Sequence, residues 1–185
     1  VSYKELIVAT ATLIQDSQLG FMSEKYYYHE VQNLRHQYRN GIVELTNIVI
    51  DQTFKSHQLA IFHLIMKYAL NLCQRNLKAQ VLTLTVNPAL QMYFNKSWGF
   101  QSRGPELRYT SNPLSKLAFM VCELSQEKRR DQLHKVPSKD PHHNIYLFVK
   151  MADRRFVYPQ RAEGQRINTA MTAAMIEYFC VKRTN

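Results

Sequence analysis

The chain has 185 residues and a formal net charge of +10 at pH 7, with 45% hydrophobic residues. This length and composition are typical of a globular domain with its own core, and no apolar run is long enough to predict a transmembrane segment. The positive charge favours an acidic partner. The basic residues are dispersed without an aromatic platform, so a nucleic-acid interface is not predicted.

Cys73, Cys122 and Cys180 lie far apart in apolar stretches. We expect buried thiols in a reducing compartment, the cytoplasm, rather than disulfides. Neither the cysteines nor the histidines have metal-ligand spacing, and we predict no metal site. The opening residues lack the features of a signal peptide. The chain also begins without a Met, so we expect further residues upstream.

The first elements in chain order are a strand, a helix and a second strand. Residues 5–14 are rich in β-branched side chains and end at a polar turn, which predicts a strand. Ser23 is a suitable N-cap for the helix that follows, and Gly41 comes after its last turn. Apolar residues recur at helical spacing between them, at Tyr27, Val31, Leu34 and Tyr38. The apolar run Ile42–Ile50 predicts a buried strand.

A second helix is predicted to begin near Ser56 and end near Asn76, and the short run Val81–Val86 has high strand propensity. Asn87 can cap a third helix, with Pro88 at its first position, and Gly99 stops it. Two further strands are expected at about residues 106–109 and 117–124. Helices alternating with apolar strands predict an α/β layered sheet.

The sequence divides at residue 124. Residues 1–124 carry the alternating elements, whereas 125–185 begin with a polar, basic linker. This C-terminal extension contains one strand candidate, at residues 145–151, and one helix candidate, at residues 168–183 with Asn168 as its cap.

Three local features bear on chemistry. The strand, polar turn and helix around Lys55 predict a helix N-terminus that can bind an anion, although a plain turn explains the same pattern. Glu44 is the only acid in its apolar strand, where burial would raise its pKa and suit a general base. The alternative is a solvated carboxylate near the strand end. Of Tyr93 and Phe94, at most one can face a site while the other packs, and a core role for both is the alternative.

Together these segments resemble the GNAT acyltransferase fold, and more narrowly the long-chain N-acyl amino acid synthases, relatives of the acyl-homoserine-lactone synthases. The resemblance rests on "VELTNIVID", "KSHQLA", "VLTLTV" and "VNPALQMYFNKSWGF", and on the helix inserted between the first two strands. It covers about residues 7–124 and implies a GNAT-like sheet with splayed central strands. The first N-terminal elements of that fold are absent from this sequence.

The resemblance implies transfer of a fatty acyl group from an acidic acyl carrier protein thioester to the α-amine of an amino acid. The donor would be carrier-bound acyl-phosphopantetheine or acyl-CoA. Glu44 would activate the amine, Tyr93 would protonate the leaving thiolate, and Asn47 would lie at the oxyanion. The residues expected to hold the thioester and its phosphate are Ile48, Val49, Ile50, Lys55, Ser56, His57, Gln58, Leu59, Ala60, Asn87 and Phe94.

The sequence departs from the family pattern in places. Only Ala60 conforms well to the glycine-rich phosphate loop, the aromatic pair is reversed to Tyr93 and Phe94, and Asn47 replaces an Arg of the lactone synthases. Two alternatives therefore stand beside the synthase: a CoA-dependent N-acetyltransferase of small acyl range, and a GNAT-derived binding protein that has lost catalysis.

Overall fold

A computed structural model describes residues 2–3, 6–39, 41–109 and 115–125 of the chain. The elements, in chain order, are β1 (Ser2–Tyr3), β2 (Leu6–Ile7), β3 (Ala9–Gln15), α1 (Glu24–Gln37), β4 (Ile42–Ile50), the 3-10 helix η1 (Gln52–His57), α2 (Gln58–Arg75), β5 (Val81–Val86), the 3-10 helix η2 (Pro88–Leu90), α3 (Gln91–Trp98), β6 (Gln101–Arg108) and β7 (Lys116–Glu123). Strands and helices alternate, which confirms the α/β class.

The main sheet has five strands in the order β3-β4-β5-β7-β6, and β1 pairs with β2 in a separate two-stranded ribbon. The central pair, β4 and β5, is parallel, and the other neighbours in the sheet are antiparallel. Both central strands have the predicted bounds, because β-branched and apolar residues dominate each of them and the first four residues of each are buried.

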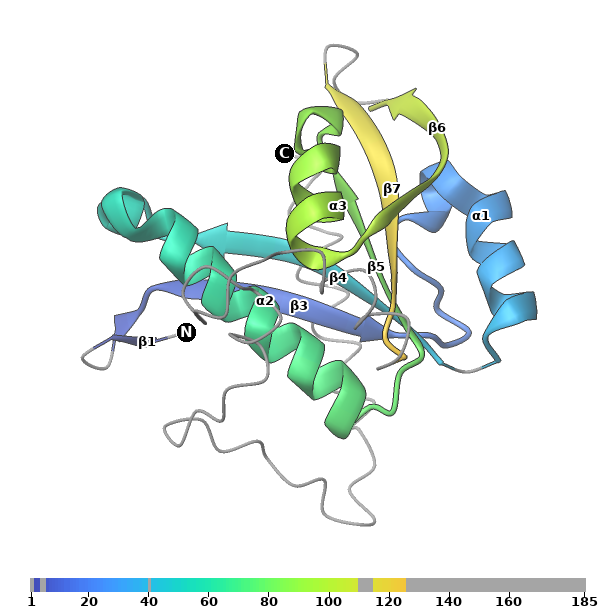
Figure 1. Ribbon diagram of the computed structural model, residues 1–185, viewed down its shortest axis with the longest axis horizontal. Coiled ribbons are helices and arrows are strands. Elements are labelled where there is room, and N and C mark those ends of the chain that lie inside the picture. The colour runs from blue at the N-terminus through green and yellow to red at the C-terminus, as the bar shows by residue number, and fades with distance from the viewer. Residues whose placement is uncertain (1, 4–5, 40, 110–114, 126–185) are drawn as a thin grey trace, which may run out of the picture. The chain divides into compact units, whose positions relative to one another are not determined.

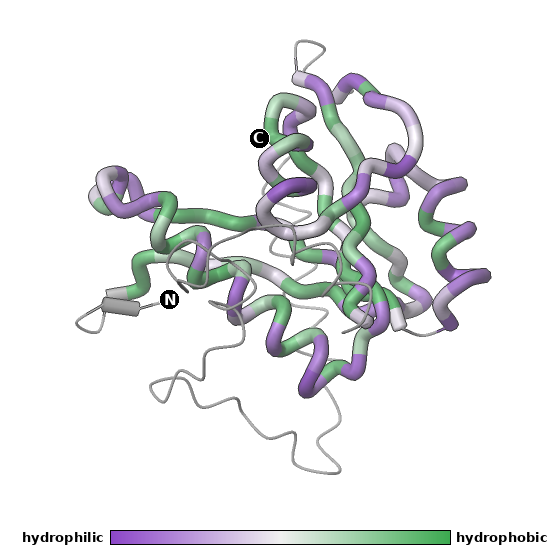
Figure 2. The backbone as a smooth tube through the Cα atoms, in the orientation of Figure 1, coloured by the Kyte–Doolittle hydropathy of each residue, from purple (hydrophilic) through white to green (hydrophobic). Residues whose placement is uncertain are grey.

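The helices cover the two faces of the sheet separately (Figure 1). Side chains alternate along a strand, so each strand contributes to two cores. Val43 and Leu45 of β4 pack with α2 and α3, whereas Ile42 packs with α1. The helices carry one apolar side each, and Figure 2 shows hydrophilic and hydrophobic residues alternating along α1.

Three predicted boundaries were wrong. The first predicted strand is divided into β2 and β3. The helix expected from Ser56 begins at Gln58, because residues 52–57 form a 3-10 turn that starts with an Asp51 cap. Strand β6 begins at Gln101 rather than near residue 106, since its exposed residues and Gly104, with φ 75°, hide the strand pattern.

Several local predictions were confirmed. Asn87 caps η2 by accepting from the Ala89 amide at 3.0 Å, and Gly99 ends α3 in the left-handed conformation, with φ 72°. Ser23 is the N-cap residue of α1, but its side chain makes no capping hydrogen bond. Cys73 and Cys122 are buried thiols.

Other predictions fall outside the described residues. These are Cys180, the strand and helix candidates of the C-terminal extension, and nearly all of residues 125–185. None of the helices in the described part of the chain has the length and apolarity that a membrane span requires.

Candidate active site

The two central strands pair only at their beginnings. Residues 42–44 of β4 pair with residues 81–83 of β5, and within the described strands no pairing between them continues further. Beyond that point the strands diverge (Figure 1). We call the side of β4 that faces β5 over residues 45–50 the open edge. Backbone groups on such an edge lack a neighbouring strand and can pair with an extended ligand.

A β-bulge interrupts the pairing of β4 with β3 over the same residues. Thr12 of β3 stands opposite Thr46, but Thr10 stands opposite Val49, so β4 has one extra residue between them. The bulge centres on Asn47, whose φ of 50° is positive and is tolerated better by Asn than by most residues. A bulge interrupts the ladder and turns a backbone group away from its partner strand. The predicted thioester-binding residues 47–50 thus lie on the bulged part of the open edge.

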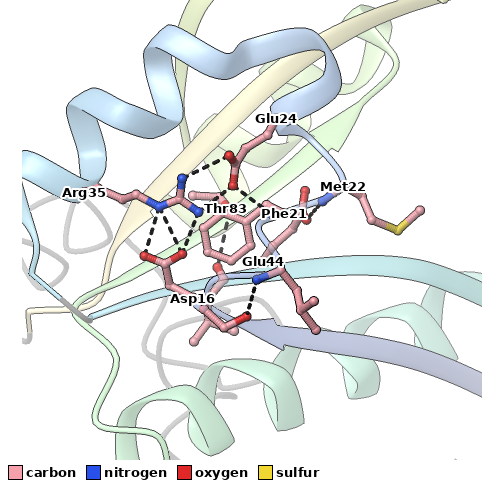
Figure 3. A network of polar contacts seen from close by, with 10 residues as sticks. Asp16, Phe21, Met22, Glu24, Arg35, Glu44 and Thr83 are labelled. Carbon is pink, nitrogen blue, oxygen red and sulfur yellow. Dashed lines mark hydrogen bonds and ion pairs between the residues drawn. The ribbon is translucent and has the colours of Figure 1, made fainter. Parts of the chain in front are cut away.

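Glu44 is the last β4 residue paired with β5, and its side chain is only 1% exposed. Its Oε2 accepts a hydrogen bond from the Met22 amide at 2.7 Å, and its Oε1 accepts one from the Ser23 amide at 3.0 Å (Figure 3). These amides immediately precede α1, where backbone donors lack helical partners. Glu44 therefore joins β4 to the start of α1, and the solvated alternative is wrong.

Burial raises the pKa of Glu44, while the Ser23 hydroxyl and the amides of Met22 and Ser23 act in the opposite direction. A raised pKa makes the carboxylate a better proton acceptor. An ionised carboxylate has about four lone-pair sites, and two of them are used by the amides here. The side chain can thus hold the backbone and still accept a proton.

A charged cluster fixes the loop between β3 and α1. Arg35 donates through Nε and Nη2 to Asp16, with a shortest distance of 2.7 Å, and through Nη1 and Nη2 to Glu24 at 3.0 and 2.5 Å (Figure 3). Glu24 also accepts from the Phe21 amide at 2.8 Å. Arg35 therefore holds both ends of the loop that presents the Met22 and Ser23 amides, through Asp16 after β3 and Glu24 at the start of α1.

The predicted phosphate-binding residues 55–60 lie at the junction of η1 and α2, just after the end of β4. All of them are exposed, and the Gln58 amide donates to the Lys55 carbonyl. The first turn of α2 starts at this junction, and helix N-termini attract anions through their donors and dipole. The structure therefore brings residues 47–50 and 55–60 to consecutive positions at one end of β4.

The two residues of the reversed aromatic pair, Tyr93 and Phe94, lie in different environments, as helix geometry requires. Phe94 is 4% exposed and packs in the core with Trp98 and Phe100, which leaves little of its surface for a ligand. Tyr93 is half-buried, and its hydroxyl lies 2.6 Å from Nε2 of His63 in α2. The Trp98 indole N–H donates to the same hydroxyl at 3.2 Å.

His63 and Trp98 were not singled out from the sequence. The signal for His63 is its position inside the apolar run "LAIFHLIM", where an imidazole needs a polar partner. Among the described residues, no group of three His, Cys, Asp or Glu side chains is arranged to hold a metal ion.

Comparison with solved structures places this geometry in a known fold. FeeM, an N-acyl amino acid synthase from uncultured soil microbes, superposes with a TM-score of 0.54 at 17% identity, over 69% of this chain and 68% of FeeM. MesI, a CoA-dependent acyl-homoserine lactone synthase, gives a TM-score of 0.50 at 12% identity, over 74% of this chain and 67% of MesI. These likenesses, at low identity, confirm the GNAT-like fold expected from the sequence.

The sequence comparisons identify the family. No curated protein matches the chain. The family model described as "N-acyl amino acid synthase FeeM" matches residues 1–120, which is more than half of the chain. The chain therefore belongs to the FeeM N-acyl amino acid synthase family and is an N-acyltransferase.

Proposed function

We propose that this enzyme transfers a fatty acyl group from a phosphopantetheine thioester on an acyl carrier protein to the α-amine of an amino acid. The amine nitrogen attacks the thioester carbonyl carbon, the C–S bond breaks, and an amide and a thiol form. Nitrogen loses one proton and sulfur gains one. The reaction therefore needs a proton acceptor, a proton donor and a site for the oxyanion.

The bulged open edge of β4 is the observation that carries this proposal. A pantetheine arm is extended and contains amide groups, so it can pair with the backbone of residues 45–50 as an added strand would. At Asn47 the bulge turns the backbone out of the ladder, where an N–H group can meet the thioester oxygen.

The two faces of the sheet beside the open edge supply the proton transfers. Glu44, on the α1 face, accepts the proton released by the amine, either directly or through water, and its raised pKa supports this role. Tyr93, on the opposite face, protonates the leaving thiolate. The start of α2, with Lys55, holds the pantetheine phosphate.

The donor's chemistry is supported by exposed apolar side chains and by charge. Val49, at 59% exposure, lies on the open edge, and Leu59, at 62%, lies in the first turn of α2. Leu90 and Met92 are exposed on the segment that follows β5. Such side chains suit a long acyl chain. The net charge of +10 suits an acidic carrier protein in the cytoplasm.

The test is to incubate the purified full-length protein with a long-chain acyl carrier thioester and a mixture of amino acids, and to detect products by mass spectrometry. We expect N-acyl amino acids, with acyl-CoA of the same chain length used less well and a KM for the carrier that rises with salt. Acetyl transfer from acetyl-CoA alone would instead indicate the small-acyl enzyme, and carrier binding without turnover would indicate an inactive protein.

Asn47 offers a matched pair of variants for the same assay. Asn47→Gly keeps a residue that adopts positive φ readily, so the bulge and the activity should persist. Asn47→Val places a β-branched residue in that conformation at a cost of about 1–3 kcal/mol, so the bulge should be lost and kcat should fall at least tenfold. Equal activity of the two variants would remove the bulge from the mechanism.

A further inference from the structure

The Tyr93 hydroxyl makes a polar contact between α2 and α3, the two helices on the same face of the sheet. His63 lies in α2, which follows β4 through η1, and Tyr93 lies in α3, which follows β5 through η2. Because β4 and β5 diverge, a contact between these helices spans the divergence. The contact is the 2.6 Å approach of His63 Nε2 to the Tyr93 hydroxyl, with the ring centroids 6.3 Å apart and the ring planes 9° from parallel.

The hydrogen-bonding capacity of each group limits what this hydroxyl can do. An indole N–H can only donate, so the Tyr93 oxygen accepts from Trp98. The His63 contact has two readings, because neutral imidazole carries its proton on either nitrogen. If Nε2 is bare, the phenol proton is committed to His63. If Nε2 carries the proton, the oxygen accepts twice and its own proton is available to a third group.

We propose that His63 is a positioning residue for Tyr93, in which Nε2–H and the Trp98 N–H both donate to the phenol oxygen and leave its proton for the departing thiolate. This inference rests on the proposed acyl transfer. The C–S bond breaks, sulfur takes the phenol proton, and the two donors stabilise the phenolate. Glu44 releases the proton it took from the amine nitrogen to solvent, and solvent reprotonates the phenolate, so no other reactant is consumed.

The surroundings of the pair are suited to this role. Burial lowers the pKa of His63, which favours a neutral ring. Burial also raises the pKa of Tyr93, and the Trp98 N–H opposes that rise. Among the described residues, His63 is the titratable side chain in contact with Tyr93. The aromatic side chains packed around the pair, Phe62, Phe94 and Trp98, carry no charge.

The first test does not depend on activity. Nitrogen-15 NMR of histidine-labelled full-length protein distinguishes the two imidazole tautomers, and the His63 signal is the one absent from His63→Gln. We expect a protonated Nε2 at neutral pH. A bare Nε2 would overturn the inference, whatever reaction the protein catalyses.

The second test uses turnover. His63→Leu removes the donor and should lower kcat about tenfold to hundredfold with little change in KM, while His63→Gln, which can donate from a similar position, should recover most of the loss. His36→Leu, an exposed histidine of α1, is the control and should match the wild type. Full activity of His63→Leu beside an active wild type would overturn the inference and leave the proposed function standing.

The pH profile of kcat distinguishes whether His63 donates a hydrogen bond to Tyr93 or accepts one from it. Removing a donor to the phenolate raises the pKa of Tyr93, so the alkaline limb of kcat should move to higher pH in His63→Leu. If His63 instead accepts the phenol proton, its removal moves that limb to lower pH, which would overturn the inference. An inactive wild type would refute the proposed function, and the tautomer measurement would still test the hydrogen-bond geometry.

Discussion

The two faces of the sheet where β4 and β5 diverge are built from different chemistry. On the α1 face, carboxylates and Arg35 hold backbone amides and one another through bonds of 2.5 to 3.2 Å. On the α2 and α3 face, aromatic rings pack around a single hydroxyl. Charged bonds to the backbone fix the path of the chain, whereas ring packing fixes one side chain. We infer that the first face sets the geometry of the amine side and the second presents a proton to sulfur.

The largest effect should come from Glu44→Gln. The variant cannot accept a proton from the amine, so kcat should fall about hundredfold while KM changes less. Glu106, an exposed carboxylate of β6, supplies the control. Glu106→Gln should behave like the wild type. Steady-state kinetics at a temperature where circular dichroism shows both variants folded would check this. Wild-type turnover in Glu44→Gln would remove Glu44 from the mechanism.

The next effect concerns stability on the charged face. Arg35→Ala leaves the Asp16 and Glu24 carboxylates without their shared cation in a partly buried site, and should lower the free energy of unfolding by about 2 kcal/mol. Arg35→Lys should restore only part of this, because an ammonium group lacks the guanidinium fork. Urea denaturation provides the measurement.

Lys116→Ala is the matched control for Arg35. Its ion pair with Glu106 is 3.7 Å long and about half exposed on both sides, so its loss should cost less than about 0.5 kcal/mol. Equal costs for Arg35→Ala and Lys116→Ala would show that the charged face is no better organised than an ordinary surface ion pair.

A smaller, pH-dependent effect distinguishes Glu44 from the rest of its face. Its pKa is raised in the folded protein above the ordinary value of 4.5. The stability that protonated Glu44 contributes is therefore fully present below pH 4.5 and is lost as pH rises through the pKa of the folded protein. The loss is about 1.4 kcal/mol for each unit between the unfolded and folded pKa values. The difference in unfolding free energy between wild type and Glu44→Gln should shrink as pH rises through this window. A constant difference would contradict the raised pKa.

The smallest effect is expected outside both faces, at the start of α2. Lys55→Ala should raise the KM for the acyl carrier about twofold to fivefold, because one exposed cation near a phosphate contributes less than about 1 kcal/mol. Raising the salt concentration should reduce the difference. An unchanged KM would count against the phosphate site, and Lys116→Ala again serves as the control.

The fold was predictable from the sequence where a single local pattern decided the outcome. Ile42–Ile50 and Val81–Val86 are rich in β-branched and apolar residues, and Asn87 and Gly99 act through their own neighbours. The start of α2 was predicted too early, since the 3-10 turn at residues 52–57 has no apolar periodicity. Strand β6 was predicted too short for the related reason that its residues are exposed.

The site was less predictable, because its contacts join distant parts of the chain. Glu44 was expected to be either a base or a solvated side chain, and no local pattern indicates that its partners are amides more than 20 residues earlier. The bulge at Asn47 depends on the register with β3. The partner of Tyr93 lies 30 residues away on another helix, so no local spacing could identify it.

Acyl transfer on the open edge of β4 is the central claim, and its most direct test is amide NMR of the full-length protein with a non-hydrolysable acyl-pantetheine thioether. We predict that the amides of residues 47–50 shift and become protected from hydrogen exchange, because the ligand pairs with them. Ligand binding that leaves these amides unchanged, with shifts confined to other strands, would contradict the claim.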